Sequence, residues 1–563
     1  MKVLFIARHF TYFRNYESVI AALASRGHRV HLAAEREEDL GGHRMVERLA
    51  ADCPGVTFGW IPDRQDRWAI FVTKLRMTID YLRYLEPAYT TTPKLRARAK
   101  ERVPRIGLWL LALTGGSTGI GRRIVRAVLC ACERGVPRSR QIDAYLAAER
   151  PDVVLFTPLI GVVVSPQLDY LQSAKALGYP TALGVWSWDH LSSKAILRSI
   201  PDRVFVWNET QQREAVTLHG VPPDRVVVTG AQCFDQWFDR APSTDRAAFC
   251  ARIGLPDRPF VLYVCSALFQ GSASEALFVQ RWIRELRTSG LEPLASTPIL
   301  VRPHPARVKE WTDVELWAEP DVAIWGRNPV DPDAKAGYFD SLFHSAAVVG
   351  LNTSAFLEAA VVGRPVFATL LPEHRENQEG TIHFHYLLKV AGGLLHTSRD
   401  LREQYEQLNA VMAGEARESE RSRRFVEGFI RPYGAAVAAT PLFADAIEKL
   451  AVLRRAPVAD SAGARLVRVA LAPLAAFMTA DAVAPLMSSH HERVIAARQR
   501  AHRARVAEAW RVKDAHDAAE QQAKDARLAE RRRHKARRAA EWRRAKTMSK
   551  LKQRIKKRIG LAS

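Results

Sequence analysis

Short apolar runs rich in β-branched residues alternate with longer segments whose apolar positions recur every three or four residues. The short runs predict strands buried on both faces, and the longer segments predict helices that cover them. The runs fall into two groups, which predict two parallel sheets. The first group is 2–8, 29–34, 56–61, 152–157, 180–187, 203–207 and 226–229, and the second is 260–266, 298–302, 322–325, 347–351 and 365–371.

A polar, proline-containing segment, 230–259, separates the two groups and is predicted to be an interdomain linker. We therefore predict an α/β protein with two tandem Rossmann-like domains, over 1–235 and 236–455, and a ligand cleft between the carboxyl ends of their strands. Basic helical sequence from about 63 to 149 predicts an α-helical insertion in the first domain. Its apolar run 107–113 is flanked by arginines, which leaves two interpretations open: a lid on the first domain or a membrane-facing surface.

The C-terminal region has a different composition. Residues 456–490 are predicted to form a linker or amphipathic segment, and 491–563 a basic helical tail. The formal net charge of the chain is +23, and the tail alone contributes +16, from 24 basic and eight acidic residues. The tail has almost no Gly or Pro, which favours one long exposed helix.

An apolar stripe runs along the end of this tail between its lysines and arginines. It consists of Met548, Leu551, Ile555 and Ile559. Such a stripe on a cationic helix is typical of a segment that lies on an anionic membrane surface. A solvated charged helix or a weak coiled coil is the alternative, and nucleic-acid binding is not expected because the tail contains no recognisable nucleic-acid module.

The remaining composition excludes several classes of protein. Six scattered cysteines include one close pair, Cys130 and Cys132, and no second pair that would complete a zinc site. No stretch reaches the roughly 18 apolar residues that a membrane span needs, and the first strand leaves no room for a signal peptide. We expect a cytoplasmic protein, either free or peripheral on the inner face of the cell membrane.

The chemistry is concentrated in the second domain. Strand 298–302 runs into Arg302-Pro303-His304-Pro305, which places a cation and an imidazole where α/β folds bind ligands. Arg302 could bind a phosphate through two hydrogen bonds, and His304 could donate a hydrogen bond or a proton to a leaving phosphate oxygen. A structural turn with a capped histidine is the alternative for this motif on its own.

A second phosphate-competent segment follows strand 347–351. Asn352, Thr353 and Ser354 precede a helix, whose first backbone N–H groups can bind an anion. Simple capping of the helix is the alternative. Glu358, one turn into the helix, could accept hydrogen bonds from sugar hydroxyls of a nucleotide.

Other polar residues also follow predicted strands. In the second domain, Ser266 is a further candidate for phosphate, and Gln378 and Glu379 are candidate sugar contacts or parts of a surface loop. In the first domain, Asp189 and His9 are candidate bases for an acceptor hydroxyl. Packing and capping explain Asp189 equally well.

These motifs resemble the donor-binding domain of GT-B glycosyltransferases. The resemblance is nearest to UDP-N-acetylglucosamine 2-epimerase, CDP-glycerol glycerophosphotransferases and bacterial capsule transferases, and it covers roughly residues 150–450. His304-Pro305 and Thr353-Ser354 match the His-Pro and Ser/Thr-rich motifs of the capsule transferases. Glu358, ahead of Gly363-Arg364-Pro365-Val366, matches the ribose-binding Glu of related proteins. The segment 226–231 followed by Asp235 is similar to the one where such proteins cross between domains.

The resemblance implies a metal-independent transferase that needs no cofactor. It would move a sugar from a nucleotide-diphosphate donor to a hydroxyl of a glycan or lipid-linked acceptor, in cell-surface polysaccharide or glycolipid synthesis. The alternatives are a CDP-glycerol-type glycerophosphotransferase, a nucleotide-sugar epimerase, and a non-catalytic nucleotide-binding or scaffold protein. All transferase interpretations require the turn at 302–305 and the helix start at 352–354 to converge on one diphosphate.

Overall fold

The computed structural model describes most of the chain, in two compact units, 1–489 and 490–563. The described ranges are 1–38, 41–115, 118–162, 164–312, 314, 319–329, 331–414, 419–453, 456–480 and 483–558.

The first sheet has seven parallel strands in the order β3-β2-β1-β4-β5-β6-β7. They are β1 (Lys2–Ala7), β2 (Arg29–Ala34), β3 (Val56–Trp60), β4 (Val153–Thr157), β5 (Thr181–Gly184), β6 (Arg203–Val206) and β7 (Val226–Val228). In the centre of the sheet, Val3 of β1 pairs with Val30 on one side and Val153 on the other. Each strand lies within a run that the apolar pattern predicts.

The second sheet has six parallel strands in the order β10-β9-β8-β11-β12-β13. They are β8 (Val261–Val264), β9 (Ile299–Arg302), β10 (Val322–Ile324), β11 (Ala347–Gly350), β12 (Val366–Thr369) and β13 (Leu395–Ser398). The sequence prediction misses β13, because this edge strand reads Leu-His-Thr-Ser, only its ends are buried, and no apolar run marks it.

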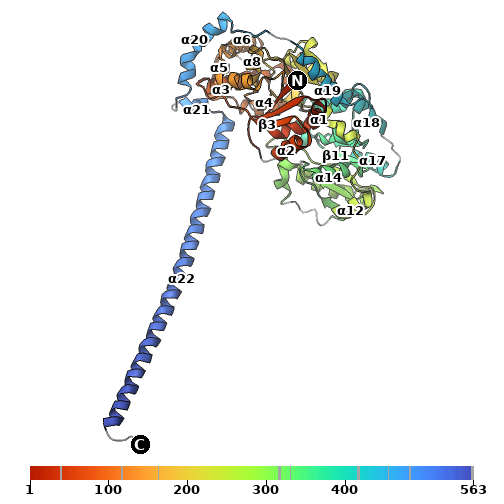
Figure 1. The fold of residues 1–563 in the computed structure, drawn as a ribbon. Coiled ribbons are helices and arrows are strands. Elements are labelled where there is room, and N and C mark those ends of the chain that lie inside the picture. The colour runs from red at the N-terminus through yellow and green to blue at the C-terminus, as the bar shows by residue number, and fades with distance from the viewer. Residues whose placement is uncertain are drawn as a thin grey trace. The chain divides into compact units, whose positions relative to one another are not determined.

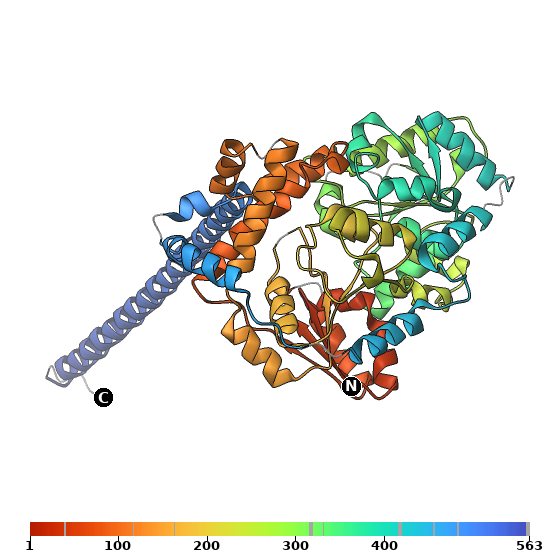
Figure 2. The ribbon, with the colours of Figure 1, turned by 90° about the horizontal axis from the view of Figure 1, so that it is seen from above.

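Helices cover both faces of each sheet, as doubly wound domains require. Around the first sheet lie α1 (Glu17–Ser25), α2 (Gly42–Asp52), α8 (Gln167–Ala176), α9 (His190–Ser193) and α10 (Glu209–His219). Around the second lie α13 (Glu275–Arg287), α14 (Pro332–Phe343), α15 (Ala355–Val361), α16 (Phe384–Lys389), α17 (Leu401–Met412) and α18 (Ser419–Phe425). Figure 2 shows these layers from above.

The helical insertion is confirmed. It contains α3 (Trp68–Arg83), α4 (Pro93–Lys100), α5 (Arg105–Leu113), α6 (Gly119–Gly135) and α7 (Arg140–Glu149). α7 differs from the others, because its buried Ile142 and Leu146 belong to the apolar core of the first sheet.

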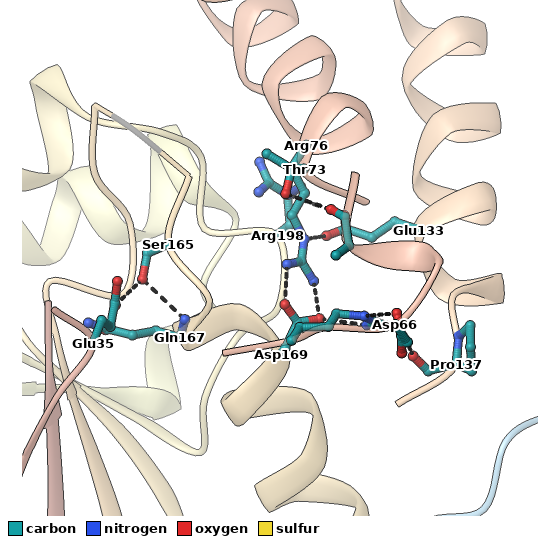
Figure 3. A network of polar contacts seen from close by, with 12 residues as sticks. Glu35, Asp66, Thr73, Arg76, Glu133, Pro137, Ser165, Gln167, Asp169 and Arg198 are labelled. Atoms are coloured by element: carbon teal, nitrogen blue, oxygen red, sulfur yellow. Dashed lines mark hydrogen bonds and ion pairs between the residues drawn. The ribbon is translucent and has the colours of Figure 1, made fainter. Parts of the chain in front are cut away.

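A buried ionic network joins the insertion to the first domain (Figure 3). Arg76 on α3 donates hydrogen bonds to Asp169 on α8 (Nη1 to Oδ2, 2.8 Å) and to Glu133 on α6 (Nε to Oε1, 2.8 Å). Arg64 also contacts Asp169, with 3.0 Å between Nη1 and Oδ1. Because all these charges are buried and paired, the network fixes α3 and α6 against α8.

Two segments pack on a different part of the protein from the one that the predicted domain bounds give them. The segment 230–259, predicted as a linker, contains α11 (Asp235–Phe238) and α12 (Arg246–Ile253), and Phe249 on α12 is in the second core. The helix α19 (Ala439–Ala451) lies in the predicted second domain, but its Phe443 and Ile447 pack in the core of the first sheet. The chain therefore crosses between the sheets twice.

The end of the first unit returns to the insertion. α20 (Ala462–Phe477) packs against α6, where Arg468 Nε donates to the carbonyl of Gly135 at 3.1 Å. α21 (Ala484–Met487) packs against α5. Figures 1 and 2 both show α20 beside the helices of the insertion.

The second unit is a single helix, α22 (His490–Arg558), of 69 residues, as the composition predicts. Met548, Leu551 and Ile555 are about half exposed on it, and Ile559 lies outside the described residues. Among the described helices, none has the length and apolar character needed to cross a membrane.

Candidate functional site

A cavity of about 290 Å³ lies where the carboxyl ends of the strands of both sheets meet. The first domain contributes residues that follow β1, β5 and β6, and the second contributes residues that follow β8, β9, β10 and β11. Its lining includes Arg14, Asn15, Trp186, Ser187, Trp188, Trp207, Arg240, Cys265, Arg302, Pro303, His304, Pro305, Arg327, Lys335, Tyr338, Thr353, Ser354 and Glu358. This is the position at which doubly wound folds bind ligands.

The two predicted phosphate motifs line this one cavity. β9 and β11 flank β8 in the second sheet, so the turn that follows β9 and the segment that follows β11 lie at the same sheet edge. Arg302 and His304 come from the first motif, and Thr353 and Ser354 from the second. The geometry that the transferase interpretation requires is therefore present.

Arg302, the last residue of β9, is a buried cation that forms no ion pair with the residues that the structure describes, although the charge of Glu358 acts on it. Its side chain is 7% exposed, and its guanidinium lies over the ring of Tyr338 (4.9 Å) and that of Trp325 (5.3 Å). Nη2 donates to the carbonyl of Arg327 at 3.3 Å, whereas Nη1 has no hydrogen-bond partner among the described residues. Burial lowers the pKa of Arg302 to about 10. A buried charge at the wall of a cavity is suited to attract an anion into it.

Glycine at position 326 leaves room for this guanidinium. Gly326 has φ +131°, a conformation that L side chains rarely adopt. A Cβ placed there would lie 2.5 Å from Arg302 Cζ. Any larger residue would move the Arg302 side chain.

His304 is held in one orientation by the backbone. The N–H of Ala306 donates to Nδ1 at 3.2 Å, so the neutral ring carries its proton on Nε2. Burial, followed by the nearby charge of Arg307, lowers the pKa of His304. The ring is therefore uncharged at neutral pH and acts as a hydrogen-bond donor through Nε2.

Glu358 on α15 is the acidic group of the cavity. Burial raises its pKa to about 7, against the opposing effects of a hydrogen bond from Tyr338 and of the charges of Arg14 and Arg302. Near neutral pH this carboxyl exists in both protonation states. It can accept or donate a hydrogen bond to a ligand hydroxyl.

Three predicted contacts support the cavity from behind and do not line it. The backbone N–H of Ser266 donates to Glu275 Oε2 at 2.7 Å, and Ser266 Oγ accepts a hydrogen bond from the N–H of Asn352 at 3.1 Å. Gln378 Nε2 donates to the carbonyl of Thr369 at 3.0 Å. These buried side chains are used in holding the strand ends together, so a direct ligand contact is not their role in this geometry. Asn352 likewise donates through Nδ2 to the carbonyl of Asn377 at 2.5 Å.

Glu379 is also outside the cavity. Its carboxylate lies 3.8 Å from Arg375 Nε, and its carbonyl interacts with His385 Nε2 at 2.9 Å. Of its two interpretations, a sugar contact and a surface loop, this geometry favours the loop.

Asp189 is placed as a structural ion-pair partner rather than a base. Burial raises its pKa, but the charges of Lys194 and His383 and hydrogen bonds from Lys194 and Ser187 hold the pKa well below its ordinary value. Lys194 Nζ and Ser193 Oγ both donate to Oδ2 at 2.7 Å. A carboxylate so strongly stabilised is a weak proton acceptor.

His9 follows β1 and lies one aromatic layer behind the cavity wall. Its ring centroid is 4.6 Å from that of Tyr12, which is 5.1 Å from that of Trp186, a lining residue. Burial lowers the pKa of His9 to about 4, so the ring is neutral at physiological pH. With so low a pKa, His9 is a weak proton acceptor, as Asp189 is, and it does not line the cavity itself.

The sequence prediction leaves out further cations and aromatic rings of the lining. Arg327 and Lys335 follow β10, at the same sheet edge as Arg302, so the argument that identifies Arg302 would have found Arg327. Lys335 Nζ also forms an ion pair with Glu17 Oε1 of α1 at 2.8 Å, which ties the two domains together across the cavity. The prediction also leaves out two aromatic rings of the lining, Trp207 and Trp237.

Buried contacts close the base of the cleft. Arg431 Nη2 donates to Asp235 Oδ1 at 2.9 Å, and the N–H of Ala231 donates to the carbonyl of Ile430 at 2.9 Å. Trp188 and Trp207 belong to the apolar core of the second sheet although they follow strands of the first. Among the described residues, no cluster of three His, Cys, Asp or Glu side chains is arranged to hold a metal ion.

No protein-family model matches the sequence, and no curated protein matches it either. Solved structures match the fold at low identity. UDP-GlcNAc 2-epimerase from Neisseria meningitidis, bound to UDP-GlcNAc, is 13% identical with a TM-score of 0.46, and the match covers 80% of this chain and 100% of that one. A glycosyltransferase from Rickettsia africae is 8% identical with a TM-score of 0.45, over 80% and 98%.

MurG from Acinetobacter baumannii is 12% identical with a TM-score of 0.39, and the match covers 80% of this chain and 99% of that one. Similarity at this level of sequence identity indicates a shared fold and does not indicate a shared activity. The two doubly wound parallel sheets, with a cavity at the carboxyl ends of both, have the GT-B-like arrangement that the sequence predicts, together with the helical insertion and the long C-terminal helix.

Proposed function

We propose that the protein is a transferase that binds a nucleotide-diphosphate sugar in the second domain and moves the sugar to a hydroxyl acceptor held against the first. One observation carries the proposal. Arg302 lines the cavity as a buried, positively charged side chain that forms no ion pair with a described residue, and its Nη1 has no hydrogen-bond partner there. A diphosphate would supply the missing counter-charge.

The surrounding residues fit the rest of such a donor. Arg14 and Arg327 add positive charge to the lining, while Tyr338 and Trp237 offer apolar ring faces for a base or sugar. Glu358 is placed to hydrogen-bond a ribose hydroxyl. Because α15 has only seven residues, we assign the diphosphate charge to these cations rather than to a helix dipole, and the proposal does not call for a metal ion.

The chemical step follows from this arrangement. The bond between the anomeric carbon and the diphosphate oxygen breaks, a bond to the acceptor oxygen forms, and the acceptor proton passes to a base. Arg302 and the Nε2–H of His304 stabilise the negative charge that develops on the leaving diphosphate. His9 and Asp189 are the two candidate bases of the first domain, and the pKa of each is lowered.

The acceptor and the tail complete the proposal. A glycan or lipid-linked acceptor at the inner face of the cell membrane suits a chain whose α22 carries exposed Met548, Leu551 and Ile555 among lysines and arginines.

Calorimetry and product analysis test the function. We expect the full chain to bind at least one of UDP, CDP or GDP, and mass spectrometry to show a glycosylated acceptor when the matching nucleotide sugar is supplied. If the acceptor instead gains glycerol phosphate when CDP-glycerol is supplied, the protein is a glycerophosphotransferase and not a glycosyltransferase. An isomerised nucleotide sugar would indicate an epimerase, and binding without any turnover would indicate a binding protein. Absence of binding to every nucleotide diphosphate would refute the site assignment itself.

A further inference from the structure

Three helices of the first unit, α5, α6 and α20, contribute to one apolar core and also expose apolar side chains on their outer faces. On α5, Ile106, Trp109, Leu110 and Leu113 recur every three or four residues, and Leu113 is 86% exposed. The inner face of the same helix is formed by Gly107 and the buried Leu111. α5 is therefore apolar on both sides, which is unusual for a helix in contact with water.

α6 and α20 repeat this pattern. On α6, Val125 and Leu129 are buried, while Ile120 is 76% exposed and Ile124 and Val128 are more than half exposed. On α20, Ala475 is buried, and the exposed apolar side chains are Leu466, Val469, Leu474 and Phe477. The inner faces of all three helices share one apolar core.

The three helices are neighbours although they lie far apart in sequence. α20 approaches α6 so closely that a Cβ at Gly135 would lie 2.5 Å from Val467 Cγ1. Pro104, next to α5, forms a backbone bridge with Ser489, which follows α21. Figures 1 and 2 both show this group of helices together. The outer faces of these helices therefore expose several large apolar side chains, and a group of exposed apolar side chains can mark an interaction site.

The charged side chains of α5, of α20 and of the first part of α6 are all arginines, two of which pair with acidic residues outside these helices: Arg126 with Glu86, and Arg468 with Asp460. Between Arg105 and Cys132 the sequence holds four arginines and no acidic residue, and α20 holds Arg465 and Arg468 and no acidic residue. Arg105, Arg123 and Arg465 are exposed. Two copies of such a surface would oppose arginine to arginine, whereas an anionic lipid layer supplies both the apolar interior and the counter-charge.

We propose that the outer faces of α5, α6 and α20 dock on an anionic phospholipid bilayer and insert their apolar side chains at its surface. This surface is separate from the apolar stripe of the C-terminal tail, and it does not depend on the transferase proposal. Because no described helix is suited to cross a membrane, the helices would lie in the plane of the interface.

Vesicle binding at two salt concentrations separates this surface from the tail. Salt of about 1 M screens charge attraction to about 3 Å but leaves apolar insertion in place. We expect the full chain to sediment with vesicles of equal phosphatidylglycerol and phosphatidylcholine at about 0.1 M and still at about 1 M NaCl. The double variant Leu113→Glu/Ile120→Glu should lose at least about tenfold in partition at high salt, because two large apolar side chains no longer insert.

Matched variants make the result specific. Leu277→Glu changes a 58% exposed leucine on α13, outside these helices, and should bind vesicles as the wild type does. Leu551→Glu/Ile555→Glu in the tail should retain the high-salt binding. Because all these side chains are exposed, circular dichroism should show unchanged folding in each variant. A second readout is the fluorescence of Trp109, taken as the difference between the wild type and the Trp109→Phe variant. Vesicles with brominated acyl chains should quench this part of the fluorescence.

Two results would overturn the proposal. One is equal high-salt binding of the wild type and the Leu113→Glu/Ile120→Glu variant. The other has two parts: the wild type does not bind vesicles, and light scattering shows that it is a dimer, which the Leu113→Glu/Ile120→Glu variant converts to a monomer. That result would assign the surface to a second copy of the chain.

Discussion

The substitution Arg302→Met separates a ligand-binding role of this buried arginine from a structural one. Methionine keeps a long apolar side chain that can pack against Tyr338 and Trp325, but it removes the charge. Burial lowers the pKa of Arg302 to about 10, from an ordinary value above 12. At about 1.4 kcal/mol per pH unit, burying the charged form costs on the order of 3 kcal/mol.

The sign of the stability effect follows from this shift. Because the pKa of Arg302 is lower in the folded state, protonation opposes folding at every pH below about 10. The variant removes that cost but also loses two cation–π contacts and one hydrogen bond, worth about 1 kcal/mol each or less. At neutral pH we therefore expect the free energy of unfolding to be unchanged or raised by up to about 2 kcal/mol.

Nucleotide binding should change in the opposite direction. Loss of a charge-assisted hydrogen bond to phosphate costs about 1.5 to 3 kcal/mol, which corresponds to roughly 10- to 150-fold weaker binding in calorimetry. Arg258→Met is the matched control, because Arg258 is exposed and pairs with Asp321 (2.7 Å) away from the cavity. A large loss of stability in Arg302→Met with nucleotide affinity unchanged would refute the reasoning and make Arg302 a structural residue.

Three further predictions concern the site and its support. Gly326→Ala should destabilise the fold by about 1 to 3 kcal/mol in urea unfolding and weaken nucleotide binding, because its Cβ would meet Arg302; unchanged affinity would contradict this. The pKa of Glu358 is raised to about 7, so its stabilising effect is present below about pH 4.5 and is lost as the pH rises to 7; Glu358→Gln should remove that part of the pH dependence of unfolding. Arg76→Met should cost about 3 to 5 kcal/mol, because it leaves Asp169 and Glu133 buried with fewer partners; a wild-type urea midpoint would show that the network contributes little.

The sheets could be predicted from sequence because each buried strand leaves a local apolar run. β13 could not be predicted in this way, because an edge strand that is half exposed to solvent needs no such apolar run. The crossing of α19 could not be predicted either, because its amphipathic pattern shows that it covers a core but not which core.

Residues that end strands could be placed near the site, but their roles depend on contacts that sequence does not record. Arg302 and Ser266 both follow strands of the second sheet. Arg302 lines the cavity and its Nη1 has no hydrogen-bond partner among the described residues, whereas Ser266 does not line it and forms hydrogen bonds with Glu275 and Asn352. In the same way, the sequence shows that Asp189 has a carboxylate that could act as a base, but only the structure shows that this carboxylate pairs with Lys194.

The return of α19 to the first sheet affects how the chain folds during synthesis. Phe443 and Ile447 fill part of a core whose other members end near residue 205. A ribosome that adds roughly 5 to 20 residues per second needs tens of seconds to make the intervening chain. During that time α1 and α2 can already pack on this face of the first sheet, but the part that α19 covers stays open, so we expect its final compaction to wait until the second domain has left the ribosome.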